Sequence, residues 1–318
     1  MNTEWGRVGN EDGIRDVIAN SAGSDFVSGR RLSFSHLTSG FTDNVFRVDA
    51  SLAEGRTRSY VAKEYLKGWH QKEKRVYEAL LQQNDFLGAP QIVGSGDGFI
   101  VLEYLDTERF AKISPQDVDL FQSWVVAKHN FFRQHPELTA PFEEDIEVQI
   151  KYLVEKPLAM LSSLDVPEVS ELKKRVFRNK NFFIDSVRLN SRLPNTLEHG
   201  DLEQQNLLVE NGVRMRVLDW VNARRGSGLF DINQFFETAN DLGANLDVPG
   251  KTREIANAVE FDNLDQALTR VRAIMLLNKI HFYGDKYLTG ELFSHSKEQT
   301  VASLLVKYLT ELQGLLGT

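Results

Sequence analysis

Hydrophobic and polar positions follow two different periods along this chain. Between residues 32 and 66, aromatic and β-branched residues alternate with polar ones, which is typical of strands, and a glycine break falls at Ser39-Gly40. Residues 91–105 predict two further strands around a glycine-rich turn at 94–98. Elsewhere the apolar positions recur at helical spacing. That spacing predicts helices over residues 69–83, 117–134, 145–164, 168–189, 261–283 and 296–316.

The change of period predicts how the chain divides. A β-rich first part followed by a mainly helical remainder indicates an α+β fold with two lobes. We expect a small N-terminal lobe over residues 1–105 and a larger helical C-terminal lobe over residues 106–318. The first lobe includes an N-terminal extension, residues 1–30, with a short amphipathic piece around Ile14 to Ile18. A chain of 318 residues is long enough to bury a substantial core.

One hairpin is predicted inside the helical part. Residues 207–210 and 213–218 are strand-like, and Asn211-Gly212 between them is the strongest short signal for a two-residue type I′ turn. The expected register pairs Glu210 with Val213, Leu208 with Met215, and Asn206 with Val217. Since side chains alternate along a strand, one face is then expected to carry Asn206, Leu208, Val213, Met215, Val217 and Asp219.

Polar oxygens flank this hairpin. The expected register makes Asn206 and Asp219 diagonal neighbours, roughly 7–8 Å apart at the backbone. Carboxylate and amide oxygens at that separation can bind one or two Mg²⁺ ions. Asp201 lies in the loop before the hairpin, where it can act as a base for a hydroxyl without binding metal. No second histidine lies at ligand spacing near His199, so a structural role is favoured for His199 over a metal ligand or base.

A second candidate site lies in the first lobe. Lys63 ends the apolar segment 59–63, and taken alone it is a solvent-facing strand lysine. In the following helix, Glu73 recurs at helical spacing with the apolar residues Trp69, Val76 and Leu80. A buried carboxylate needs a cationic partner, and Lys63 is the natural one. Glu78 takes this role if the helix has a different phase.

The region around the hairpin resembles the catalytic and metal-binding loops of a known family. In order along the chain it contains His199-Gly200-Asp201, Asn206, the hairpin and Leu218-Asp219-Trp220. The family it resembles is the aminoglycoside phosphotransferase and choline kinase-like family, which has the protein-kinase-like fold. The resemblance implies that Asp201 accepts the proton of a substrate hydroxyl, and that Asn206 and Asp219 bind Mg²⁺. It also implies that Asp231 braces the catalytic loop, although an aspartate there is also a common helix cap.

The same resemblance implies a nucleotide site in the first lobe. Lys63, paired with Glu73, is expected to hold the α- and β-phosphates. The segment with Gly40 and Thr42 resembles the loop that covers the nucleotide. The backbone of Glu103 and Leu105 is expected to meet the adenine.

The implied function is an ATP- and Mg²⁺-dependent phosphotransferase that transfers the γ-phosphate to a hydroxyl of a small molecule. Gly200 and Glu203 stand where protein kinases carry Arg and Lys, which favours a small-molecule substrate. Residues 203–205 replace the His-Pro-Gly of many family members. Two alternatives stay open: a nucleotide-binding pseudokinase with a regulatory role, or a kinase for choline, homoserine or sugar-type metabolites rather than an antibiotic.

Composition and net charge limit which partners, cellular location and cysteine chemistry the protein can have. A net charge of −8 argues against a nucleic-acid partner, and no apolar run reaches the roughly 18–20 residues that span a bilayer. The chain has no cysteine, which excludes disulfides and thiolate sites, and we expect a cytoplasmic protein. The acidic run 143–147 either attracts a substrate amine or begins a helix. Arg224 and Arg225 either contact substrate or form a solvated basic turn, and the basic turn is favoured.

Overall fold

The structure is a computed structural model, and it forms two compact units. One consists of residues 1–124 and 201–223, and the other of residues 125–200 and 224–318. The predicted lobe boundary at residues 105–106 stays a prediction. The structure describes residues 8–27, 32–37, 44–65, 71–81, 85–106, 113–165, 170–193, 196–241, 244–259, 264–289 and 295–316.

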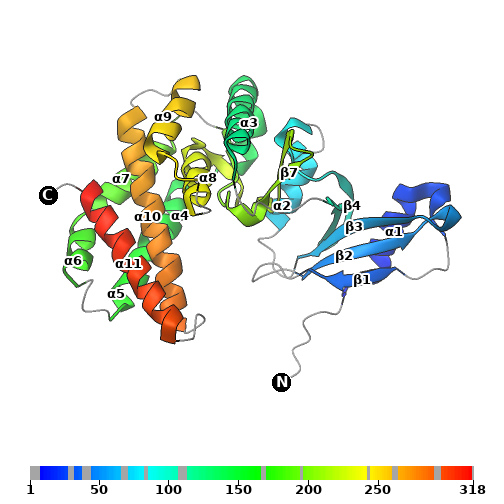
Figure 1. The fold of residues 1–318 in the computed structure, drawn as a ribbon, viewed down its shortest axis with the longest axis horizontal. Helices are drawn as coiled ribbons and strands as arrows, with labels where there is room; N and C mark the ends of the chain where they lie inside the picture. Colours follow the sequence, from blue (N-terminus) through cyan, green and yellow to red (C-terminus); the bar gives the residue numbers. More distant parts are fainter. Residues whose placement is uncertain are drawn as a thin grey trace. The chain divides into compact units, whose positions relative to one another are not determined.

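The first unit contains a five-stranded antiparallel sheet, whose strand order is β1-β2-β3-β5-β4 (Figure 1). All five strands lie in the regions where the sequence predicts strands. In the central register, Lys63 of β3 lies between Val45 of β2 and Ile100 of β5. The strands are β1 (Ser33–His36), β2 (Asn44–Ser51), β3 (Thr57–Glu64), β4 (Ile92–Gly96) and β5 (Phe99–Glu103).

The two faces of this sheet carry different residues. One face packs against the N-terminal helix α1 (Glu11–Ala22), whose Ile14 and Ile18 are fully buried. Alternation along the strands places Lys63 on the opposite face from that core. Helix α1 of the N-terminal extension is therefore an integral layer of the unit. The strand side chains in its core are Phe46, Val48, Ala50, Tyr60, Ala62, Phe99 and Val101.

The helix after β3 has the phase that the sequence predicts. It comprises α2 (Gln71–Val76) and a π-helical turn, η4 (Tyr77–Leu81). Glu73 is 1% exposed and Val76 is fully buried, whereas Glu78 is exposed and accepts a hydrogen bond from Ser95 Oγ at 2.7 Å. Glu73 therefore lies on the inward face, and the alternative assignment to Glu78 is not needed.

The predicted hairpin exists, but its register differs from the expected one. Strands β7 (Leu207–Glu210) and β8 (Arg214–Val217) are antiparallel. Asn211 and Gly212 both have positive φ (54° and 71°), as a type I′ turn requires, and the Val213 N–H donates to the Glu210 carbonyl at 3.1 Å. Pairing then resumes with Glu210 opposite Arg214, so Val213 is an extra, unpaired residue. The expected register was wrong by one residue.

This shift changes which side chains share a face. Leu208 now pairs with Arg216, and Val209 pairs with Met215, so the single face predicted for Asn206, Leu208, Met215 and Val217 is wrong. Asp219 has left the extended conformation altogether. The Leu218 N–H nevertheless donates to the Asn206 carbonyl at 2.8 Å, which keeps the two ends of the hairpin together.

The base of the hairpin is held by the segment before β4. The Val217 N–H donates to the carbonyl of Gly88 at 2.9 Å, and Trp124 Nε1 donates to the carbonyl of Leu87 at 3.1 Å. Gly88 has φ +74°, and a Cβ there would lie 2.3 Å from the Met215 carbonyl oxygen. Only glycine permits this backbone approach.

The second unit is mainly helical, with one small antiparallel sheet of β6 (Thr196–Glu198) and β9 (Arg224–Gly226). The helix α10 is central to it and contacts α5, α7 and α11 (Figure 1). The helices are α3 (Pro115–Gln134, which begins in the first unit), α4 (Ile146–Ile150), α5 (Lys156–Ser163), α6 (Ser170–Arg178), α7 (Lys180–Asn190), α8 (Leu229–Asp241), α9 (Val248–Ala258), α10 (Leu264–Thr289) and α11 (His295–Leu315).

Short helical turns connect several of these helices and strands. A π-helical turn, η8 (Lys151–Glu155), separates α4 from α5. The other short helices are 3₁₀ turns: η1 (Gly23–Asp25), η2 (Ala53–Gly55), η5 (Asp85–Leu87), η6 (Pro136–Leu138), η7 (Ala140–Phe142), η10 (Gln204–Asn206) and η11 (Trp220–Asn222).

The predicted α+β class is confirmed, but several elements differ from the expected ones. The helix expected over residues 168–189 is two helices that are interrupted at Asn179. The pattern did not predict α8, α9, β6 or β9.

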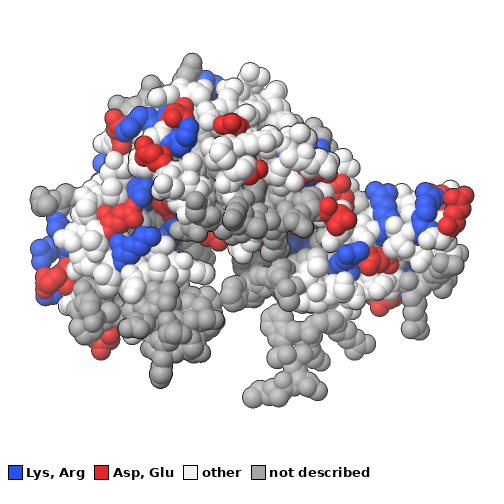
Figure 2. Space-filling view, viewed as in Figure 1, with Lys and Arg blue, Asp and Glu red and all other residues white. Residues whose placement is uncertain are grey.

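Within the described part of the chain, no helix combines the length and apolar character that crossing a bilayer requires. Figure 2 shows basic and acidic side chains interspersed on the visible face.

The packing of α1 on the sheet gives a stability prediction. Replacing Ile18 by Ala removes a fully buried side chain between α1 and the sheet, and we expect the free energy of unfolding to fall by about 2–5 kcal/mol. Val213→Ala, at a position that is 71% exposed, should change it by less than about 0.5 kcal/mol. Urea unfolding followed by circular dichroism measures both. Equal stabilities of the two variants would show that α1 does not pack on the sheet.

Candidate active site

Lys63 is the meeting point of three elements of the first unit. Its Nζ lies 2.6 Å from Glu73 Oε2 of α2 and 2.8 Å from Asp219 Oδ1, two residues after β8. The predicted Lys63–Glu73 ion pair is therefore present. Burial disfavours the charged lysine, but the carboxylates of Glu73 and Asp219 outweigh it and raise the pKa of Lys63 above its ordinary value. Lys63 stays cationic throughout the neutral range.

Asp219 has an unusual backbone. Its φ of 60° and ψ of 64° are left-handed, a conformation that costs free energy in residues other than glycine and that clusters at functional sites. The next residue anchors it: Trp220 is fully buried, and its Nε1 donates to the Val217 carbonyl at 3.0 Å. The Asp219 side chain itself is 40% exposed, so its carboxylate contacts Lys63 and remains accessible.

Asn206 is bonded directly to Asp201. Its Nδ2 donates to the backbone carbonyl of Asp201 at 2.8 Å and to the carboxylate Oδ2 of Asp201 at 3.2 Å. The carboxamide nitrogen is thereby committed, which leaves Oδ1 as the atom through which Asn206 could bind a cation. The same bonds fix the orientation of the Asp201 carboxylate.

These donors fit a magnesium ion. Mg²⁺ prefers oxygen ligands, and proteins commonly bind it through one or two side chains while waters and phosphates complete the octahedron. The Asp219 carboxylate and the Asn206 carboxamide oxygen supply such ligands. Among the described residues, no three histidine, aspartate or glutamate side chains gather closely enough to form a metal site of their own.

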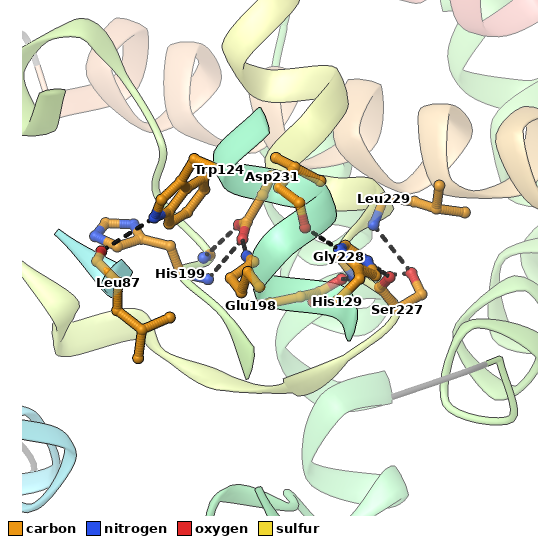
Figure 3. Close-up of polar contacts among 12 residues, drawn as sticks. Leu87, Trp124, His129, Glu198, His199, Ser227, Gly228, Leu229 and Asp231 are labelled. Atoms are coloured by element: carbon orange, nitrogen blue, oxygen red, sulfur yellow. Dashed lines mark hydrogen bonds and ion pairs between the residues drawn. The ribbon is translucent and has the colours of Figure 1, made fainter. Parts of the chain in front are cut away.

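The loop that leads into Asp201 is held by Asp231 (Figure 3). The backbone N–H groups of His199 and Gly200 donate to its two carboxylate oxygens at 2.8 and 2.9 Å, and Lys128 Nζ donates to Oδ2 at 2.7 Å. Burial works against the charge on Asp231, but Lys128 and these donors lower its pKa below the ordinary value. The helix-capping alternative belongs instead to Ser227, whose Oγ accepts the Leu229 N–H at 3.2 Å.

A second buried carboxylate lies one residue before this loop. Glu198 is fully buried, and it accepts hydrogen bonds from the Gly228 N–H at 2.8 Å and from Arg224 Nε at 3.0 Å (Figure 3 shows Glu198 with Ser227 and Gly228). The Arg224 side chain is only 12% exposed. Its interpretation as part of a solvated basic turn was therefore wrong, because it neutralises a buried glutamate.

His129 packs against the same segment. Its ring nitrogens lie 2.9 Å from the carbonyl oxygens of Val125 and Ser227. Burial, together with the charge of Lys128, lowers the pKa of His129 to about 4, so the ring is neutral at neutral pH. His129 thus contributes packing and hydrogen bonding there, and no charge.

Arg225 and the acidic run 143–147, for which the sequence left a substrate contact open, have partners within the second unit. Arg225 Nη1 lies 2.7 Å from Glu143 Oε2. In the same acidic run, Asp145 caps α4 by accepting the Glu147 N–H at 2.7 Å, which agrees with the helix-start interpretation.

The structure does not test the other residues that the sequence predicts to contact the nucleotide. Gly40 and Thr42 lie outside the described residues. Glu103 is engaged within the protein: its carboxylate accepts the Gln91 N–H at 2.9 Å and pairs with Arg216, while its own N–H donates to the Gln91 carbonyl. Leu105 follows the end of β5 and is partly exposed. An adenine contact by the backbone of Glu103 and Leu105 stays a prediction.

Among the described residues, sequence reasoning missed four buried charged ones, Glu64, Lys128, Glu198 and Arg216. A signal existed for Lys128, because it recurs at helical spacing with the buried Phe121, Val125 and Phe132 of α3. The argument that identified Glu73, a charge on an apolar stripe, applies to it equally. No comparable local signal marks Glu198, whose partner Arg224 lies 26 residues away.

Comparison with known proteins identifies the family of the chain. Residues 33–268 match the model of the phosphotransferase enzyme family, APH. A search of curated proteins finds no match.

Solved structures show the same fold. A choline/ethanolamine kinase family protein from Mesorhizobium loti is 15% identical with a TM-score of 0.61, over 96% of this chain and 95% of that chain. A macrolide 2'-phosphotransferase type I is 14% identical with a TM-score of 0.60, over 95% and 98%. The gentamicin-APH(2")-IIa complex is 17% identical with a TM-score of 0.53, over 96% and 97%.

These likenesses confirm the predicted protein-kinase-like fold, and the family match covers most of the chain. The chain therefore belongs to the phosphotransferase enzyme family, and it is a phosphotransferase that acts on a hydroxyl group of a small molecule.

Proposed function

We propose that this enzyme transfers the γ-phosphate of ATP, in the presence of Mg²⁺, to a hydroxyl group of its small-molecule substrate. The observation that carries the proposal is the convergence on Lys63 of the Glu73 and Asp219 carboxylates, at 2.6 and 2.8 Å. A fixed cation beside an accessible carboxylate suits a polyphosphate that arrives with a divalent metal.

Each residue then has a separate task. Lys63, placed by Glu73, steadies the α- and β-phosphates. Asp201, oriented by Asn206, accepts the proton of the acceptor hydroxyl as that oxygen attacks the γ-phosphorus and the bond from phosphorus to the bridging oxygen breaks, releasing ADP. Asn206 and Asp219 would hold the Mg²⁺, which when bound neutralises charge on the phosphates. Catalysis of this kind depends mainly on positioning and charge stabilisation.

The pseudokinase alternative has less support. Every residue type that the chemistry requires is present, and the described ones contact one another: Asn206 with Asp201, and Lys63 with Glu73 and Asp219. A binding protein that needed only nucleotide affinity would not require a base fixed by a neighbouring amide.

The acceptor is proposed only as a class. The names of two similar structures contain choline, ethanolamine or gentamicin, which are hydroxyl compounds with a cationic nitrogen. A net charge of −8 favours the approach of cations. Hydroxyl compounds with a net positive charge, such as amino alcohols and aminoglycosides, are therefore the first acceptors to test, ahead of zwitterionic homoserine and neutral sugars. The cytoplasmic location and the absence of a nucleic-acid partner stay predictions.

Replacing Asp201 by Asn tests the base. The carboxamide keeps the size of the side chain but cannot take a proton, so we expect kcat to fall by about 100-fold or more while the Kd for MgATP stays within about twofold. Phosphate transfer to a panel of amino alcohols and aminoglycosides, with calorimetric ATP titration, measures both. The matched control is Asp119→Asn, at an exposed position of α3. Equal turnover in wild type and Asp201→Asn would favour the pseudokinase.

Replacing Asp219 by Ala tests the metal site. We expect turnover to be lost while metal-free ATP still binds, because Lys63 and Glu73 remain in place. Titration of Mg²⁺ at fixed ATP should show that the metal no longer tightens nucleotide binding in this variant. Asp97→Ala, which removes an exposed aspartate from the turn between β4 and β5, should leave the Mg²⁺ response unchanged. A normal Mg²⁺ response in Asp219→Ala would exclude Asp219 as a ligand.

A further inference from the structure

The face of the sheet that carries Lys63 is organised in rows. The first row is Val45, Lys63 and Ile100, and the second is Arg47, Val61 and Leu102. The third row pairs Asp49 with Ser59, and Tyr104 follows the last paired residue of β5 beside it. Rows that are two residues apart are separated by roughly 6.5 Å along the strands.

A polar cluster occupies the second and third rows. Arg47 Nε donates to Asp49 Oδ1 at 3.0 Å, and Arg47 Nη2 donates to Ser59 Oγ at 3.1 Å. Ser59 Oγ donates in turn to the same Asp49 oxygen at 2.6 Å. The guanidinium carbon lies 4.6 Å from the centroid of the Tyr104 ring. Arg47 is thus a flat cation, held at a fixed place against an aromatic ring.

The cluster is fixed and also accessible. The side chain of Arg47 is 39% exposed and that of Asp49 is 30% exposed. An arginine that served only to solvate a strand surface would not need two hydrogen-bond partners and a ring to hold its plane. Ordering a long side chain costs conformational entropy, so a surface arginine held at three contacts indicates a defined use.

The position of the cluster relates it to the nucleotide. If Lys63 holds the phosphates, the base lies further along the same face, because the predicted adenine contacts, residues 103–105, are at the end of β5. Moving from the Lys63 row toward that end leads first to the row of Val61 and Leu102, which are apolar and have Arg47 beside them on β2, and then to Tyr104. An apolar floor with a flat cation and an aromatic ring beside it suits a purine, since bases stack on aromatic rings and on guanidinium planes.

We propose that Arg47 and Tyr104 form the base-recognition end of the nucleotide site, with the purine stacking against the guanidinium plane of Arg47. Asp49 and Ser59 are positioning residues for that guanidinium. This inference depends on the proposed function, because it assigns one end of the same ATP site. It makes Arg47 a determinant of preference for purine over pyrimidine nucleotides.

The chain supplies a matched control on the other face of the same sheet. Arg58, on β3, also places its guanidinium over a tyrosine, 5.4 Å from the Tyr60 ring centroid. It is exposed, and its strand position alternates with Ser59 and therefore faces away from the Lys63 side. Arg58→Ala removes the same charge and the same kind of contact from the unit without touching the proposed base site.

The experiment compares Arg47→Ala, Arg47→Lys and Arg58→Ala for KM and kcat with ATP and CTP. We expect Arg47→Ala to raise KM for ATP by about fivefold or more, with kcat within about twofold and little change for CTP, because a small pyrimidine overlaps the guanidinium less. Arg47→Lys should behave like Arg47→Ala, since an ammonium lacks the plane. Arg58→Ala should keep the wild-type KM.

Each contrary outcome has one meaning. If Arg47→Ala and Arg58→Ala have the same KM for ATP, the assignment of Arg47 to the base site is wrong. If Arg47→Lys restores the wild-type KM, stacking on the guanidinium plane is wrong. If wild type and Arg58→Ala transfer no phosphate from ATP to any acceptor of the panel and do not bind ATP, it is the proposed function that fails.

Discussion

The buried ammonium of Lys63 is the constraint on which the rest of the candidate site depends. A lysine with a side chain only 10% exposed needs carboxylates around it, because an uncompensated buried charge is costly. Glu73 satisfies it from α2, and Asp219 satisfies it from the chain after β8. Strand β3, the following helix α2 and the chain after β8, where Asp219 lies 156 residues beyond Lys63, are thereby tied to one atom. The left-handed backbone of Asp219 and the burial of Trp220 beside it place the carboxylate where Lys63 can reach it.

Buried carboxylates that accept backbone hydrogen bonds stabilise the segment before Asp201. Asp231 accepts the backbone N–H groups of His199 and Gly200, and Lys128 neutralises it. Glu198 accepts the N–H of Gly228, and Arg224 neutralises it; both carboxylates are fully buried. Buried carboxylates that are both hydrogen-bonded and paired hold a backbone more rigidly than apolar packing does, because their geometry is directional. Asp201 follows immediately in the chain. Asn206 then orients its side chain.

The sequence predicted the parts of this site that depend on local pattern. The order from His199 to Trp220 indicated the family, and a charge on an apolar stripe indicated the Lys63–Glu73 pair. The hairpin register was wrong because the Asn-Gly signal specifies two positive φ angles and does not specify whether Val213 stays in the ladder. Helix α9 was missed because Pro249-Gly250 looks like a turn, although proline is well tolerated in the first turn of a helix. Glu198 and Arg224 were beyond prediction, since their pairing depends on tertiary contacts between β6 and β9.

Our central proposal is that a nucleotide phosphate and a divalent metal meet at Lys63, Asp219 and Asn206. It is tested most directly by a crystal structure of the enzyme with ADP and Mn²⁺, with the anomalous signal of manganese used to place the metal. The account predicts a manganese ion bound by Asp219 Oδ and Asn206 Oδ1, with Lys63 Nζ on a nucleotide phosphate and still paired with Glu73. It predicts that Asp201 is near the metal and does not ligate it. A manganese peak that contacts neither Asp219 nor Asn206, or a Lys63 that remains away from every phosphate, would contradict the account.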